Sequence, residues 1–123
     1  MKILSIDFGT KRIGLAIWNS SADVVLPYGQ AGGPIEVIDL IIKEKIDKIV
    51  LGLPLSLDSS ENDNTRKIRN FAEQIKEQSG VEVNFVDERF SSQMSDRMGG
   101  AESASRDEKS AIILLNTYLE TLN

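Results

Sequence analysis

The apolar residues of this chain fall into short runs, and the first of these runs have the composition of β-strands. Residues 2–8 and 13–18 are rich in apolar, strand-forming side chains, and only residues 9–12 separate them. This pattern predicts a β-hairpin with a short loop. A third run at residues 23–28 follows a polar turn, so the three segments together predict an antiparallel meander.

Further along the chain, apolar residues at helical spacing alternate with short continuous runs. Pro34 suits the first turn of a helix, and an apolar stripe follows it. Residues 48–53 form a nearly continuous apolar run, which is typical of a strand buried on both faces. The other expected elements are a helix from 34 to about 46, a helix from 61 or 62 that Gly80 terminates, a strand at 82–86, a short helix at 91–98, a loop at 99–104 and a last helix at 107–122.

This order of elements predicts an α/β fold. Three strands joined by hairpins, followed by two strands joined through helices, give a mixed five-stranded sheet with three antiparallel and then two parallel strands. Right-handed crossovers place the carboxyl ends of the first, fourth and fifth strands at one edge, with helices on both faces. This is a ribonuclease H-like arrangement. At 123 residues, we expect residues 1–123 to form a single domain of this ribonuclease H-like fold.

The composition excludes several kinds of chemistry. The chain has no cysteine and no histidine, which removes disulfides, thiol nucleophiles and imidazole bases. Any catalysis must therefore use carboxylates, lysine, hydroxyl groups or a metal ion. No apolar run has the length of a signal-peptide core or a membrane span, so we expect a cytoplasmic protein.

Three acidic residues stand at the ends of expected elements. Asp7 closes the first apolar run, Glu88 follows the fifth strand and Asp107 opens the last helix. If the fold gathers these carboxylates, they repel one another until a divalent cation neutralises them. A cluster of hard oxygen ligands suits Mg²⁺ or Mn²⁺, which share their coordination shell with water and substrate phosphates. The sequence therefore points to phosphodiester chemistry.

Each acid also has another interpretation. Asp7 could cap a hairpin turn, or belong to a phosphate loop like the Asp-x-Gly-Thr of sugar kinases and actin-like ATPases. The actin-like alternative needs two such domains, which this length does not supply. Glu88 could form surface ion pairs, which contribute little. Asp107 could simply complement the dipole of its helix.

The net charge of −5 argues against a protein that coats nucleic acid non-specifically, because such binding rewards a basic surface. Several bases nevertheless lie beside the three acids in sequence. The alternative is that each is an ordinary solvated charge. The candidate phosphate-backbone contacts are Lys11, Arg12, Arg89 and Lys109.

Four motifs in order resemble the YqgF family, whose members are described as Holliday-junction-resolvase-like proteins and pre-16S rRNA nucleases. The motifs occupy residues 6–16, 50–54, 86–92 and 107–111, and the resemblance runs from residue 3 to about 120. It implies a ribonuclease H-like fold, a cytoplasmic location and three metal-binding acids, carried over to Asp7, Glu88 and Asp107. Two segments depart from the family: Asp58-Ser59 replaces the usual Asp-Gly, and residues 99–105 lack the frequent bases.

The leading hypothesis is a metal-dependent nuclease that matures the 5′ end of pre-16S rRNA. Asp7, Glu88 and Asp107 would hold one or two Mg²⁺ or Mn²⁺ ions, and the bases would position the phosphate backbone without recognising sequence. One alternative is a Holliday-junction resolvase, which needs a dimer for two symmetric cuts. Another is a non-catalytic RNA- or protein-binding factor in ribosome assembly or transcription. We expect a monomer or weak homodimer.

Overall fold

The computed structural model describes residues 1–8, 12–53, 63–87 and 106–121, with the backbone alone for Arg106 and Asp107. Within these residues the strands are β1 (Lys2–Phe8), β2 (Ile13–Asn19), β3 (Val24–Ala31), β4 (Lys48–Leu53) and β5 (Glu82–Asp87). The helices are α1 (Pro34–Lys43), α2 (Asp63–Ser79) and α4 (Arg106–Thr121). The expected helix at 91–98 and loop at 99–104 lie outside the described residues.

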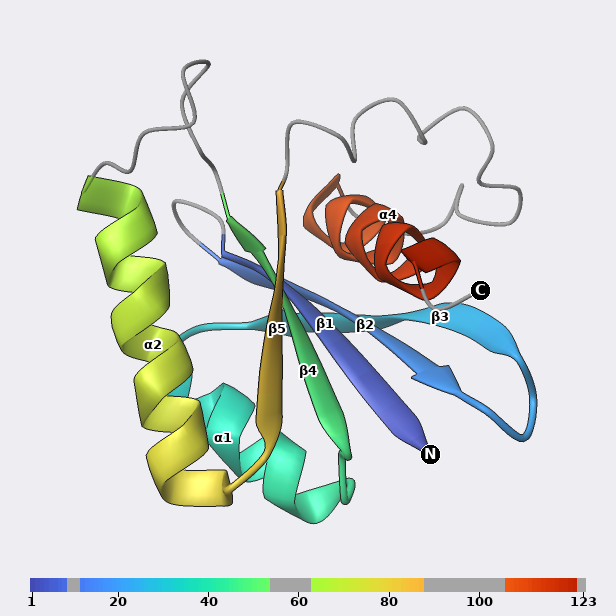
Figure 1. The fold of residues 1–123 in the computed structure, drawn as a ribbon, viewed down its shortest axis with the longest axis horizontal. Coiled ribbons are helices and arrows are strands. Elements are labelled where there is room, and N and C mark those ends of the chain that lie inside the picture. Colours follow the sequence, from blue (N-terminus) through green and yellow to red (C-terminus); the bar gives the residue numbers. More distant parts are fainter. Residues whose placement is uncertain (9–11, 54–62, 88–105, 122–123) are drawn as a thin grey trace.

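The five strands form one sheet in the order β3-β2-β1-β4-β5. β1 pairs antiparallel with β2, and β2 with β3, whereas β1–β4 and β4–β5 are parallel. The mixed topology predicted from the sequence is therefore confirmed. It places β1, β4 and β5 side by side with their carboxyl ends at one edge of the sheet, which we call the carboxyl edge (Figure 1).

Side-chain alternation along the strands divides the core into two layers. Leu4 and Ile6 of β1 belong to the larger apolar cluster, which includes the inner faces of α1 and α2. Ile3, on the other face of the same strand, belongs to a second cluster with α4 residues such as Leu115. Figure 1 shows α1 and α2 on one side of the sheet and α4 on the other, so helices cover both faces as expected.

The structure differs from the sequence prediction at the end of β3. The expected strand stopped at residue 28, whereas β3 continues to Ala31. The pairing with β2 shifts between Leu15 and Ala16, which is a β-bulge, and Gly29 next to it has a φ of 99°. Glycine tolerates this conformation. Gly29, which in the sequence favoured a loop, therefore lets β3 continue past the bulge.

Helix α1 also ends earlier than expected, at Lys43 rather than near Ile46. The backbone N–H of Lys45 donates to the carbonyl of Ile42, and that of Ile46 donates to Ile41. These two bonds make a Schellman motif, with Lys45 in the left-handed region at φ 54°. Ile46 lies after the end of α1 but is buried. Its apolar side chain therefore fitted the apolar stripe of the helix and made the predicted helix too long. None of the described helices is long and apolar enough to cross a membrane.

Candidate functional site

Asp7 lies at the carboxyl edge of the sheet, on the face that α4 covers. Ile3 and Ser5 of the same strand face α4, and alternation puts Asp7 on that face two residues further along. The Asp7 side chain is half-buried. Its neighbour Phe8 points to the opposite face, where its ring meets that of Phe71 edge-on at 5.2 Å between centroids. The strand thus presents a carboxylate where the sheet ends.

The strands on both sides of Asp7 have a glycine beside it. Gly14 of β2 is its direct cross-strand partner. On the other side, Ile6 is in register with Leu51 of β4, so the next position along β4 is Gly52. Neither glycine has a side chain to fill the space next to the Asp7 carboxylate. Both glycines are buried, and a larger residue at either position would place a side chain beside Asp7.

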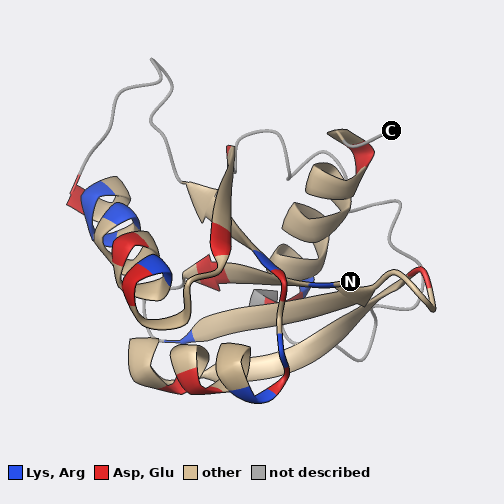
Figure 2. Cartoon of the chain, turned by 60° about the horizontal axis from the view of Figure 1, so that its bottom comes forward, with Lys and Arg blue, Asp and Glu red and all other residues tan. Residues whose placement is uncertain are grey.

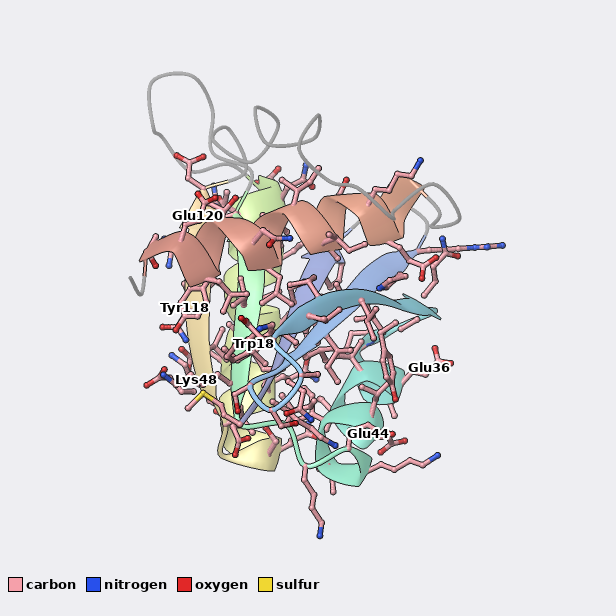
Figure 3. All side chains as sticks on the ribbon, turned by 90° about the vertical axis from the view of Figure 1, so that its right-hand side faces the viewer. Trp18, Glu36, Glu44, Lys48, Tyr118 and Glu120 are labelled. Carbon is pink, nitrogen blue, oxygen red and sulfur yellow. The ribbon has the colours of Figure 1, made fainter. Side chains whose placement is uncertain are left out.

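The direction of α4 follows from three contacts with the sheet. The Ser5 hydroxyl donates to the backbone carbonyl of Ala111. Nearer the start of α4, a carboxylate oxygen of Glu108 accepts a 2.8 Å hydrogen bond from the backbone N–H of Gly29. Toward its end, Tyr118 shares an apolar cluster with Trp18, and both are labelled in Figure 3. The first turn of α4 therefore lies toward the carboxyl edge, and its last turns lie toward the opposite edge.

This arrangement brings the backbone of Asp107 toward the end of the sheet that carries Asp7. Asp7 is two residues past Ser5, about 7 Å along a strand. Asp107 is four residues before Ala111, about 6 Å along a helix. Both acids thus lie on the same side of the Ser5–Ala111 hydrogen bond. The side chain of Asp107 is outside the described structure, so its approach to Asp7 stays a prediction.

Glu88 lies outside the described residues altogether. It directly follows Asp87, which ends β5 and pairs with Leu53 at the end of β4. Asp87, the residue before Glu88, therefore lies at the carboxyl edge. Among the described side chains, which include Asp7 but neither Glu88 nor Asp107, no three Asp, Glu, His or Cys residues group closely enough to hold a metal ion. The three-acid centre remains a prediction.

The described part of the site fits a hard divalent cation. Asp7 offers carboxylate oxygens, the ligand type that Mg²⁺ and Mn²⁺ prefer. The side chain of Asp7 is only half-buried, so part of it stays accessible to such an ion.

Two of the four residues predicted to contact phosphate lie in the part of the chain that the structure describes. Arg12 precedes β2 at the carboxyl edge, is exposed, and donates from Nη1 to the amide oxygen of Gln30 at 2.9 Å. Lys109 is exposed on the first turns of α4. Lys11 and Arg89 lie outside the described residues. Because the partner of Arg12 in this bond is a neutral amide, the bond orients the guanidinium without neutralising its charge.

Sequence reasoning missed two residues that shape this site. Gln30 holds Arg12 from a strand 18 positions away, and nothing in the local pattern signals that contact. Glu108 adjoins Asp107 and shares its position in a first helical turn, but it bonds to Gly29 of β3. The two adjacent acids therefore differ: Glu108 anchors the helix, which leaves Asp107 as the candidate ligand.

Comparison with known proteins identifies the family. Residues 1–121 match the model of the RuvX family, described as "Holliday junction resolvase". The chain belongs to the RuvX family. This membership confirms the resemblance to YqgF proteins.

Relatives from several bacteria match nearly the whole chain, and each is named "Putative pre-16S rRNA nuclease". The protein of Maridesulfovibrio salexigens is 38% identical, over 97% of this chain and 98% of the relative. That of Sulfurihydrogenibium sp. is 35% identical, over 99% and 92%. A protein of Escherichia coli O9:H4 is also 35% identical, over 96% and 95%.

Among solved structures, "Thermus thermophilus RuvC structure" superposes with a TM-score of 0.68, at 11% identity, over 97% of this chain and 93% of that one. A second, "T. thermophilus RuvC in complex with Holliday junction substrate", gives a TM-score of 0.66 at 12% identity, over 97% and 92%. At this level of identity the likeness concerns the fold. It confirms the ribonuclease H-like architecture.

Proposed function

We propose that this RuvX-family chain is a divalent-metal-dependent nuclease that hydrolyses phosphodiester bonds in the maturation of the 5′ end of pre-16S rRNA. Residues 1–123 would act as one nuclease domain, in the cytoplasm, where ribosomal RNA is transcribed. The observation that carries the proposal is the position of Asp7. Its carboxylate stands at the carboxyl edge of the sheet between Gly14 and Gly52, on the face covered by α4.

Asp7, Glu88 and Asp107 are the residues that would hold the cation. A bound cation would offset negative charge on the scissile phosphate and lower the pKa of a water molecule, so that hydroxide would be available as the nucleophile. Asp7, the central acid in our proposal, is half-buried on a strand and so has little freedom to move. In this proposal the side chains of the protein hold and orient the cation and the substrate rather than transfer protons. This agrees with the lack of histidine and cysteine.

The bases orient the substrate. Arg12, held by Gln30, lies on the β2 side of Asp7 and would bind a phosphate oxygen of the backbone. Lys109, exposed two residues after Asp107, would bind another. Lys11 and Arg89 complete the proposed set. Contacts of this kind fix the register of the strand without recognising its sequence.

A second candidate function is cleavage of four-way DNA junctions. The description of the RuvX family model favours it. That reaction needs two symmetric cuts and therefore two copies of the chain, whereas trimming of an RNA end needs one. The 5′-end function fits the names of the curated relatives.

The discriminating experiment offers the purified protein three labelled substrates: a 16S rRNA precursor, single-stranded DNA and a four-way DNA junction. Each is incubated with Mg²⁺, with Mn²⁺ and with a chelator. We expect divalent-dependent cleavage of the precursor at a defined site near its 5′ end. Paired symmetric cuts in the junction alone would support the resolvase instead. Binding of the precursor with no cleavage under any condition would indicate a non-catalytic assembly factor.

A further inference from the structure

We propose that the start of α2 carries a second contact surface for the phosphate backbone of the substrate, formed by Arg66, Lys67 and Arg69. We call these three residues the α2 basic turn. The inference rests on the proposed function, because it concerns the same substrate. It adds a surface on the face of the sheet that α2 covers, opposite the face that carries Asp7.

The α2 basic turn is a local reversal of the charge of the chain. The protein carries a net charge of −5, yet three of the four residues 66–69 are bases, and all three are exposed. The acid nearest in sequence that the structure describes is Asp63, which approaches Arg66 at 3.5 Å with both side chains largely in solvent. Such an exposed pair contributes little and is readily exchanged for a phosphate. Figure 2 shows blue segments gathered in the first half of α2.

The α2 basic turn lies toward the carboxyl edge. Phe8, the residue after Asp7, packs against Phe71 of α2 with ring centroids 5.2 Å apart. Helix α2 runs from this edge toward the start of β5 (Figure 1), so residues before Phe71 lie at or beyond the end of β1. The bases of the turn precede Phe71 by two to five positions, which brings them to the carboxyl edge, where β1 ends.

One base of the α2 basic turn also contacts β5, the outermost strand of the sheet on that side. The guanidinium of Arg69 lies 5.1 Å from the ring centroid of Phe85 in β5. Phe85 is in register with Leu51, and Leu51 with Ile6, so this contact is one residue below the level of Asp7. Basic side chains thus lie on two sides of the carboxyl edge, with Arg12 beside β2 and the α2 basic turn on the α2 face, where Arg69 reaches β5.

The bases at the opposite edge have different partners. Lys2 lies 3.8 Å from Glu44, and Lys48 lies 3.7 Å from Glu82. Figure 3 shows Glu44 and Lys48 at this end of the molecule. Acids lie close to these bases, as Asp63 does to Arg66 of the α2 basic turn. Arg12 at the carboxyl edge instead donates to a neutral amide, which leaves its charge available to a polyanion.

The geometry also sets the length of substrate required. From β1, where Asp7 lies, to β5 is two strand spacings, roughly 10 Å. Successive phosphates of one strand advance about 3.4 Å along a nucleic-acid helix. A substrate that contacts both Asp7 and the α2 basic turn must therefore extend at least about three nucleotides past the scissile bond on that side.

The test compares two double variants with the same change in charge. Arg66→Gln with Lys67→Gln removes two bases of the α2 basic turn. Lys43→Gln with Lys45→Gln removes two exposed bases at the opposite edge and serves as the matched control. Binding of RNA is measured in the Asp7→Asn background without divalent cations, across a series of salt concentrations. Circular dichroism and thermal unfolding confirm that each variant folds.

We expect the α2 variant to bind more weakly and to flatten the log–log salt dependence by about 1.8 for a duplex, or about 1.4 for a single strand, and the control to do neither. A substrate that extends fewer than about three nucleotides from the scissile bond toward the α2 basic turn should bind equally well to the α2 variant and the control. Equal slopes for the α2 variant and the control on a long substrate would overturn the inference.

The same experiments test the nuclease proposal independently of the α2 surface. If the parent protein cleaves RNA but the α2 variant binds like the control, the α2 surface is wrong and the nuclease proposal survives. If the parent protein cleaves nothing while the α2 variant loses binding and the control does not, the surface is supported and the nuclease proposal fails.

Discussion

The hydroxyl of Ser5 donates a hydrogen bond to the backbone carbonyl of Ala111, 106 positions further along the chain. Ser5 is fully buried. The bond ties the middle strand of the sheet to α4, and together with the Glu108–Gly29 bond it sets which end of the sheet the first turn of the helix covers. The position of Asp107 relative to Asp7 thus depends on an uncharged residue outside the proposed metal site.

Substitution of Ser5 should therefore affect stability and cleavage together. Ser5→Ala removes one buried hydrogen bond and should lower the free energy of unfolding by about 1 kcal/mol. Ser5→Val adds volume beneath α4, so we expect a loss of about 1–3 kcal/mol and reduced cleavage as the helix shifts. Urea unfolding and a cleavage assay measure the two effects. Unchanged cleavage in a destabilised Ser5→Val protein would show that the helix position does not matter for the reaction.

The adjacent acids at the start of α4 should separate into two roles. Asp107→Asn removes a proposed metal ligand and should lower cleavage at least about a hundredfold while changing stability little. Glu108→Gln weakens the bond to Gly29 and should cost about 1 kcal/mol of stability while cleavage persists. The same charge is removed in both variants, so each controls for the other. The opposite result would move the metal ligand to Glu108.

Arg12 and its partner Gln30 should also be separable. Replacing Lys11 and Arg12 together by Gln should flatten the salt dependence of duplex binding by about 1.8 in the log–log slope, because two phosphate contacts are lost. Gln30→Ala keeps the positive charge but frees the guanidinium, so binding should weaken while the slope stays the same. A salt dependence that ignores the double substitution would show that these bases do not contact the substrate.

The parts of the fold that the sequence predicted are those fixed by local patterns. β1 and β4 were predicted with their observed bounds, because each is an apolar run that a local signal ends: Gly9 follows β1, and Pro54 follows β4. Asp7 was placed at the carboxyl edge for the same reason. The end of β3 was not predicted, because the effect of Gly29 depends on a bulge in the pairing with β2.

The contacts that organise the site are long-range and have no local signature. Glu108 meets Gly29 across 79 positions, so the sequence, which pointed to Asp107 as the metal ligand, gave no sign that Glu108 anchors the helix to β3. The neutral partner of Arg12 could not be identified until β2 and β3 were paired. Convergence of Glu88 and Asp107 with Asp7 is a prediction that family membership supports and the described side chains do not test.

Tyr28 provides a pH-dependent contribution to stability. Burial, together with the hydrogen bond and negative charge of Glu44, raises the pKa of Tyr28 above its usual value of 10.0. The folded protein keeps this proton at pH values where the unfolded chain loses it, so the contribution is complete below about pH 10 and is lost as the pH rises through the folded pKa. Urea unfolding between about pH 9 and 11 should show a smaller alkaline loss for Tyr28→Phe than for the parent protein. Equal losses would contradict this.

The most direct test of the central claim is cleavage of the 16S rRNA precursor by Asp7→Asn, measured in a single turnover with Mg²⁺ or Mn²⁺ beside the parent protein. The substitution removes a ligand charge and almost no volume, so the fold should be unchanged. We predict that cleavage falls at least about a hundredfold while metal-free RNA binding holds or tightens. Cleavage by a purified, folded Asp7→Asn protein at the rate of the parent would contradict a metal site at Asp7.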